Sequence, residues 1–311
     1  MPTKTINQKT LIGIVIVYLF MLIGLFWDDW WHVFMGRDSF FIPPHNILYT
    51  ALLVAAVLQL WLWKKHSALR PLLNIALGGL VLTFLSAPFD EWWHRTFGIE
   101  NLSTPFAVWS PPHLIALIGG AISAWGFFRL IKNHDTGKFP LLTLTQLSVV
   151  LGLLWFIVHP VDPIGLYATF FSPWAEVLFI LPFIACLAAA RRITPGGAAT
   201  VAAIFLALYA ITWTERVADF IIVPPHPVAP LFPYVFAIGA SALLIEWWGE
   251  RKYQLILGLL AGVIFVALHV LLPQPFIFET PLIFTSTDTL IFLVTGALAG
   301  MAGVGLNKNL T

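Results

Sequence analysis

Hydrophobic residues in this chain are gathered into ten long runs that contain few charged residues. A run of ~20 apolar residues is long enough to cross the hydrocarbon core of a bilayer as one helix. The predicted spans are approximately 11–31, 46–63, 72–93, 113–131, 140–159, 175–190, 198–220, 228–248, 255–272 and 290–306. We therefore predict an all-α fold, a polytopic membrane helix bundle of about ten transmembrane helices.

The composition supports a membrane protein. Of the 311 residues, 59% are hydrophobic and only 10% are charged, and the mean hydropathy is +0.89. A soluble domain of this length needs more charged surface than that. The net charge of +1 gives no sign of a nucleic-acid partner. The single cysteine, Cys186, argues against disulfides and thiolate metal clusters.

Basic residues are divided unequally between the two sets of connections that alternate along the chain. Arg37, Arg95 and Arg216 are the basic residues of one set. The other set and the termini hold the remaining 13 of the 16: Lys4, Lys9, Lys64, Lys65, Arg70, Arg129, Lys132, Lys138, Arg191, Arg192, Arg251, Lys252 and Lys308. An excess of Lys and Arg in short loops marks the cytoplasmic side. We therefore predict a bacterial-type inner membrane, cytoplasmic termini and outward-facing loops between the basic ones.

The outward connections also repeat a pattern. DDWWHVFMGRDSFFIPPH begins at Asp28, DEWWHRTFGIENLSTPFAVWSPPH begins at Asp90, and a fainter copy, ERVADFIIVPPH, begins at Glu215. Repetition of a unit that cannot bury its own face predicts five helical hairpins with polar residues at their outer ends. The two strongest copies delimit a metal-binding membrane domain at 1–135, followed by degenerate repeats at 136–311.

The first copy brings together side chains that can bind a metal. Asp28 and His32 are four residues apart, which places both on one face of a helix. His45 follows a Pro-Pro pair at the predicted start of the next helix, where proline is well tolerated. The hairpin thereby predicts one carboxylate and two imidazoles at one end of the bundle.

The second copy offers the same trio as Asp90, His94 and His113, with a longer loop before the last histidine. Nitrogen and carboxylate ligands suit copper, zinc or iron better than calcium or magnesium. Three protein ligands leave a coordination position open. An alternative is that these are interfacial polar residues within a tryptophan belt. Ionisable groups at membrane depth are costly unless paired or liganded, which favours the metal site.

Further residues near these trios are candidates for supporting or additional roles. Arg37 and Asp38 are the best supporting pair, because a metal-bound imidazole usually donates its other N–H to a carboxylate or carbonyl, and Glu91 adjoins Asp90. Glu215, Asp219 and His226 occupy the third copy in a similar order and are weaker metal candidates. Arg216 offers an alternative explanation for the two acidic residues, because it can form an ion pair with either.

The first motif resembles the C subunit of the particulate methane and ammonia monooxygenases. That family has a stretch of the form D-x-x-W-H-x4-R-D-T-x-F-x-P-S-H, and Asp28, His32 and His45 match its copper ligands at identical spacing. Surrounding matches are Trp31, Arg37, Asp38, Phe41 and Pro43. A second family site, Asn-Glu-Trp-x-His with a later histidine, is similar to 90–94 and His113, with Asp90 in place of the asparagine. The resemblance covers about 100 residues, through the fourth predicted span.

The resemblance implies copper as the cofactor and an oxygen-dependent oxidation of a small apolar substrate, in a subunit that can have other membrane subunits as partners. A non-enzymatic protein that binds or passes copper at the outer face is the alternative. A third hypothesis is a zinc hydrolase with Asp29 or Glu91 as general base. All three have the lipid bilayer as a partner, and none involves nucleic acid.

Overall fold

The structure is a computed structural model that describes residues 6–34, 41–97, 110–134, 139–158, 173–222, 231–247, 253–271 and 285–310. Within some helical ends only the backbone is described. Every described element is a helix, so the predicted all-α class is confirmed for this part of the chain. The α-helices are α1 (Gln8–Phe34), α2 (Pro43–Lys65), α3 (Arg70–Phe97), α4 (Pro111–His134), α5 (Pro140–Val158), α6 (Pro173–Ile193), α7 (Gly197–Ile222), α8 (Leu231–Trp247), α9 (Gln254–Phe265) and α11 (Ser286–Leu310).

Each predicted span coincides with a helix over its described residues. Six helices in the described ranges are long and apolar enough to cross a membrane, namely α1, α2, α3, α4, α5 and α11. Outward-facing side chains are also apolar: Leu53, Val57 and Leu85 are each more than half exposed. A water-soluble protein rarely leaves apolar patches of that extent uncovered. These helices therefore fit an integral membrane protein, while the full count of ten spans stays a prediction.

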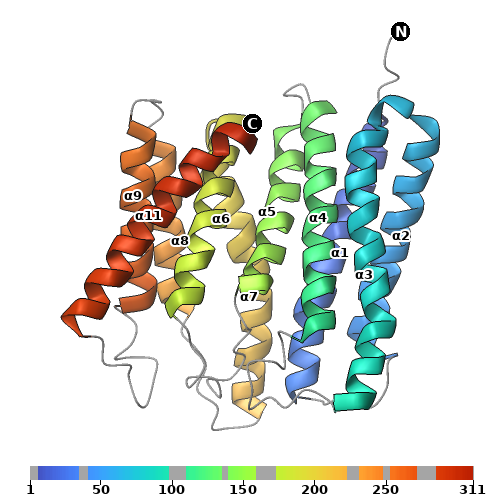
Figure 1. The fold of residues 1–311 in the computed structure, drawn as a ribbon, viewed down its shortest axis with the longest axis horizontal. Helices are drawn as coiled ribbons and strands as arrows, with labels where there is room; N and C mark the ends of the chain where they lie inside the picture. Colours follow the sequence, from blue (N-terminus) through green and yellow to red (C-terminus); the bar gives the residue numbers. More distant parts are fainter. Residues whose placement is uncertain are drawn as a thin grey trace. The chain divides into compact units, whose positions relative to one another are not determined.

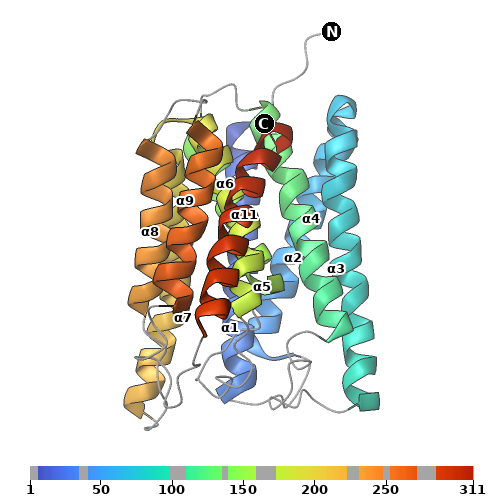
Figure 2. The same cartoon turned by 60° about the vertical axis from the view of Figure 1, so that its left-hand side comes forward.

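The chain divides into two compact units, Met1–Val161 and Asp162–Thr311. In the first unit, the helices form a closed ring in which α1, α2, α3, α4 and α5 each pack against the next, and α5 packs against α1 (Figures 1 and 2). The division falls one helix later than the predicted boundary at 135, because α5 is held by contacts with α4 and α1.

The second unit forms a ring of its own, in the order α6, α7, α8, α9 and α11, with α11 returning to pack against α6. Glycines allow the α9 and α11 backbones to approach closely. A Cβ at Gly262 would collide with the backbone of Gly296, and a Cβ at Gly300 with that of Gly258. Close backbone contact through small residues is a usual way for membrane helices to associate.

The predicted five-hairpin arrangement is supported only in part. α1 packs against α2, α3 against α4, α7 against α8, and α9 against α11. The remaining hairpin would pair α5 with α6, and these helices belong to different units. Five hairpins therefore stay a prediction. The ninth predicted span also differs from a single α-helix, because its end, Val266–Leu271, is a π-helix, here η3.

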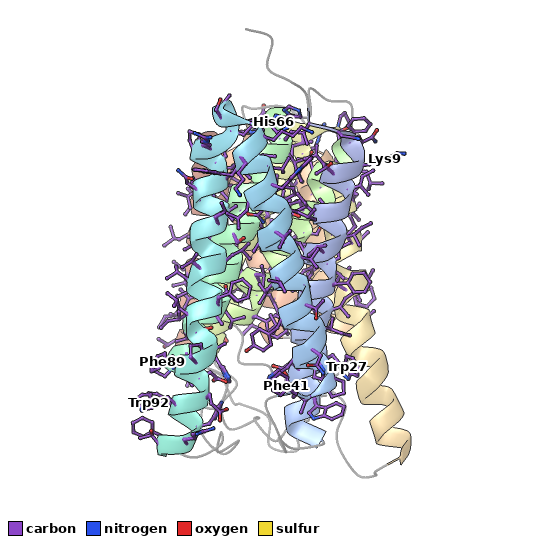
Figure 3. The ribbon with its side chains drawn as sticks, turned by 90° about the vertical axis from the view of Figure 1, so that its right-hand side faces the viewer. Lys9, Trp27, Phe41, His66, Phe89 and Trp92 are labelled. Atoms are coloured by element: carbon purple, nitrogen blue, oxygen red, sulfur yellow. The ribbon has the colours of Figure 1, made fainter. Side chains whose placement is uncertain are left out.

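The two ends of the first unit differ chemically (Figure 3). Lys9 and His66 lie at one end, which we call the basic end. Trp27, Phe41 and Trp92 lie at the other, which we call the aspartate end because Asp28 and Asp90 are there. Antiparallel neighbouring helices place the last turns of α1 and α3 beside the first turns of α2 and α4. This arrangement positions the candidate site.

Candidate metal centre

The ligand candidates of the first unit come from four consecutive helices that meet at the aspartate end. Asp28 lies about two turns before the end of α1, and Asp90 and His94 lie in the last two turns of α3. His45 and His113 are each the third residue of the helix that follows, α2 and α4. The predicted alternation of a late aspartate and an early histidine is therefore observed in the helix boundaries.

Proline pairs fix where the two histidine-bearing helices begin. α2 starts at Pro43, after Ile42 in extended conformation, and α4 starts at Pro111. The first intrahelical bonds run from Asn46 N to Ile42 O and from Leu114 N to Ser110 O, each at 3.0 Å. Proline has no N–H, so Pro-Pro removes two donors that would have no partner in the first turn. The absence of these two N–H groups matters near lipid, because an unpaired backbone group there is costly.

The side chains of Asp90, His94 and His113 converge, and we call them the Asp90 centre. Asp90 Oδ1 lies 3.0 Å from His94 Nε2 and 3.1 Å from His113 Nε2. The two imidazole rings are 5.9 Å apart between centroids. One ligand atom from each residue lies within 4.8 Å of the others. The three residues that the sequence grouped therefore lie together across α3 and α4.

Two of the ligand–ligand distances in the Asp90 centre fit a transition-metal ion. Metal–nitrogen and metal–oxygen bonds of about 2.1 Å keep neighbouring ligand atoms about 3.0–3.4 Å apart, for bond angles between a right angle and tetrahedral. The two Asp90–imidazole distances fall in this range. Asp90 and His94 are each 7% exposed, whereas the side chain of His113 is 29% exposed. The centre is thus buried on the α3 side and reachable on the α4 side.

A second grouping, the Asp28 pair, joins α1 to α2. Asp28 Oδ1 lies 2.9 Å from Nε2 of His45, which is buried. Tyr49 packs edge-on against the His45 ring, with centroids 5.6 Å apart. Tyr49 was not among the predicted residues, although its position one helical turn after His45 was a usable signal. The backbone of His32 belongs to α1, and its side chain lies outside the described residues.

Helix ends contribute to the electrostatics of both groupings. The aligned peptide dipoles of a helix create a positive potential at its first turn that favours a nearby anion, even where Pro-Pro removes two of the N–H groups. The Asp28 carboxylate lies beside the first turn of α2, and the Asp90 carboxylate beside the first turn of α4. A carboxylate at each position offsets that potential and gives an incoming cation a negative ligand. With a neutral side chain at either position, a bound cation would lie beside a positive helix end without a negative ligand.

The other predicted residues have different placements. Glu91 forms a salt bridge with Arg95 at 2.7 Å, on an exposed part of α3. Glu215 and Asp219 belong to the backbone of α7, but their side chains lie outside the described residues. Arg37, Asp38 and His226 lie outside the described residues altogether. Their proposed contributions therefore stay predictions.

The chain was compared with protein-family models, with curated proteins and with solved structures. None of the three comparisons gives a match. The candidate site therefore has to be interpreted from its own geometry and from the spacing of its residues.

Proposed function

We propose that this chain is an integral membrane copper protein that oxidises a small apolar substrate with oxygen, with copper at the Asp90 centre. The observation that carries the proposal is the convergence of one carboxylate and two imidazoles, whose ligand atoms lie within 4.8 Å of one another. The centre lies at the end of a bundle with an apolar exterior, so an apolar substrate can reach it from the lipid.

Copper is the preferred ion on chemical grounds. Imidazole suits copper, zinc and iron, and copper(II) has the highest affinity of the divalent first-row metals for such ligands. The spacing of the first motif, which resembles the monooxygenase C subunit, points to the same metal. Zinc at full occupancy without copper would instead favour a hydrolase, in which a metal-bound water is the nucleophile.

The Asp28 pair is the second proposed copper position. Asp28 and His45 supply a carboxylate and an imidazole in contact, and His32 follows Asp28 by one turn of α1. With His32 added, the position would have the same ligand types as the Asp90 centre. We treat the two positions as separate sites, each bound between one pair of neighbouring helices.

The proposed reaction inserts one oxygen atom of O2 into a substrate C–H or N–H bond. The other oxygen atom leaves as water, which requires two electrons and two protons from a reductant such as a quinol. Copper, when bound, would supply one-electron redox chemistry and activate oxygen. Asp90 would hold the ion at a fixed position between α3 and α4, and partly exposed His113 would lie at the side from which substrate enters.

Turnover of the copper-loaded full-length protein in lipid nanodiscs tests the proposed activity. We expect oxygen-dependent hydroxylation of a short hydrocarbon or of ammonia, with a quinol as reductant. His94→Ala should abolish product formation. Arg95→Gln is the matched control, because Arg95 is the exposed neighbour of His94 and should leave turnover unchanged. If the copper-loaded protein forms no product, even when candidate partner membrane subunits are added, the proposed monooxygenase activity is refuted.

A non-enzymatic copper-handling protein is the second candidate function. The 29% exposure of the His113 side chain favours it, because an exposed ligand can take an ion from a carrier or give it to one. This function predicts rapid exchange of copper with a soluble chelator and no oxygen consumption. Copper that resists a chelator while supporting turnover would exclude it.

A further inference from the structure

Several uncharged polar side chains lie buried inside the first unit, away from the aspartate end. They include Tyr18 on α1, Gln59 on α2, Ser123 on α4 and Gln146 on α5, each with 0% exposure. Ten residues separate Tyr18 from Asp28, which is about 15 Å along α1. Polar groups so far inside a membrane bundle are costly unless they are hydrogen-bonded, and they often mark function.

Three of these side chains form a hydrogen-bonded chain across α1, α2 and α4, and Gln146 of α5 bonds to the α4 backbone beside it; we call the four the amide–hydroxyl cluster. Gln59 Nε2 donates to Tyr18 Oη at 2.8 Å, and Tyr18 Oη and Ser123 Oγ share a hydrogen bond. Gln146 Nε2 donates to the carbonyl oxygen of Ala124, the residue after Ser123, at 3.0 Å. Tyr18 therefore links α2 to α4, and Gln146 approaches the same stretch of α4 from α5.

Two acceptors of the cluster have no donor within the described part of the protein. They are Gln59 Oε1 and Gln146 Oε1, both fully buried. If the Gln59 amide were flipped, Oε1 would accept a hydrogen bond from the Tyr18 hydroxyl, but Nε2 would then have no acceptor. Turning over the Gln146 amide would place its oxygen against the Ala124 carbonyl. Neither orientation satisfies both amide groups, and an unsatisfied buried acceptor destabilises the folded protein.

We propose that this amide–hydroxyl cluster binds internal water. The missing partner must donate hydrogen bonds, must be small and need carry no charge, because the cluster contains no carboxylate that would balance a cation. Water meets these requirements, since it donates two hydrogen bonds and is held inside proteins by two to four polar groups. The site is separate from the Asp90 centre and does not depend on the proposed copper chemistry.

Radiolytic labelling of the full-length protein in nanodiscs tests the proposal. An X-ray pulse converts a bound water into a hydroxyl radical in place, so a buried side chain beside it is oxidised although bulk solvent cannot reach it. We expect Tyr18 to be oxidised in the wild type, as exposed Tyr253 is. Phe183 is the dry reference, because it is fully buried among aromatic rings. Tyr18 oxidised no more than Phe183 would overturn the proposal.

Variants provide a second readout that does not depend on labelling. In Gln59→Leu/Gln146→Leu, we expect oxidation of Tyr18 to fall to the level of Phe183. We also expect an unchanged or lower Tm, because the variant gives up hydrogen bonds to bound water. In a dry cluster the same substitutions would remove two unsatisfied acceptors, so a higher Tm would overturn the proposal. The wild-type labelling result stands even where a variant fails to fold.

Discussion

At the scale of residues, the Asp90 carboxylate is the group on which the candidate site depends most. One of its oxygens is close to an imidazole from its own helix and to another from the next helix. Its burial would be expensive without partners of that kind, because a carboxylate in an apolar environment loses its hydration. The same arrangement that relieves this cost also presents three ligands of mixed type to one small volume.

The two groupings should bind metal independently. Asp28→Asn keeps the size of the side chain but removes its charge, so the metal held with His45 should be lost while the metal of the Asp90 centre stays. Asp90→Ala, which removes the ligand oxygen altogether, should have the converse effect. Metal content of the purified variants measures both. Loss of all metal from either single variant would show that the two positions form one shared centre.

The residues of the candidate site were predictable to the extent that they follow local spacing. The i,i+4 relation placed Asp90 and His94 on one face of a helix, and the Pro-Pro-His order placed His113 at the start of the next. The cluster of Tyr18, Gln59 and Ser123 had no such signal. Single polar residues in apolar helices acquire partners only through helix packing, which a single sequence does not specify.

At the scale of elements, the contact between α3 and α4 carries the Asp90 centre. Asp90 and His94 belong to one of these helices and His113 to the other, so their convergence requires a fixed distance between the two backbones. Gly79 and Gly119 allow that approach. A Cβ at Gly79 would collide with the backbone of Gly119 and Ser123, and neither backbone segment can move without displacing a helix.

Gly79→Ala should therefore destabilise the first unit. We expect a loss of about 1–3 kcal/mol from the forced contact, together with weaker metal binding. Gly78→Ala is the matched control on the same helix, because a Cβ there meets nothing within 4 Å. Removing a helical glycine in open space should leave stability unchanged or raise it by up to about 1 kcal/mol. Tm measurements in detergent compare the two, and equal Tm values would contradict the packing argument.

In the second unit, Glu246 stabilises the start of α7. Its carboxylate accepts hydrogen bonds from the backbone N–H groups of Gly196 and Ala198, and it lies 2.9 Å from Arg191 Nε. Glu246→Ala should cost about 1–2 kcal/mol, as expected for the loss of a helix-capping side chain. The Tm of this variant is the measurement. Gln254→Ala, which removes an exposed partner of Arg192, should have a much smaller effect, and an equal effect would refute the capping role.

Hydropathy predicted the helices well because lipid requires long apolar segments whatever the tertiary fold. The predicted start at Pro140 agrees with α5, and Pro88 and Pro182 lie inside helices that continue through them. The change to a π-helix at Val266 could not be foreseen, because the apolar composition of this run is the same as that of an α-helical span.

At the scale of the whole molecule, the described α-helices form two rings of five, one in each unit, and the ligand candidates with described side chains belong to the first. The basic and aspartate ends of that ring are opposite, as the distribution of Lys and Arg predicts. The unit boundary at 161 was less predictable, because the motifs mark where ligands lie and not which helices pack together. The orientation of the ring in a membrane follows from the loop charges alone and is therefore a prediction.

Cysteine labelling in intact cells tests that orientation. Ser67 is exposed at the basic end and Thr96 at the aspartate end, while the native Cys186 is buried. A membrane-impermeant maleimide should label Thr96→Cys from outside and leave Ser67→Cys unlabelled until the membrane is opened. The reverse labelling pattern would place the Asp90 centre on the cytoplasmic side.

Metal analysis of the purified full-length protein tests the central claim most directly. We expect the wild type to contain copper with nitrogen and oxygen ligands and no sulfur, as X-ray absorption would report. His94→Ala/His113→Ala should lose about one equivalent of copper, because two of the three ligands are gone. Arg95→Gln should keep the full amount. Equal metal content in the wild type and in the double variant would contradict a metal centre at Asp90, His94 and His113.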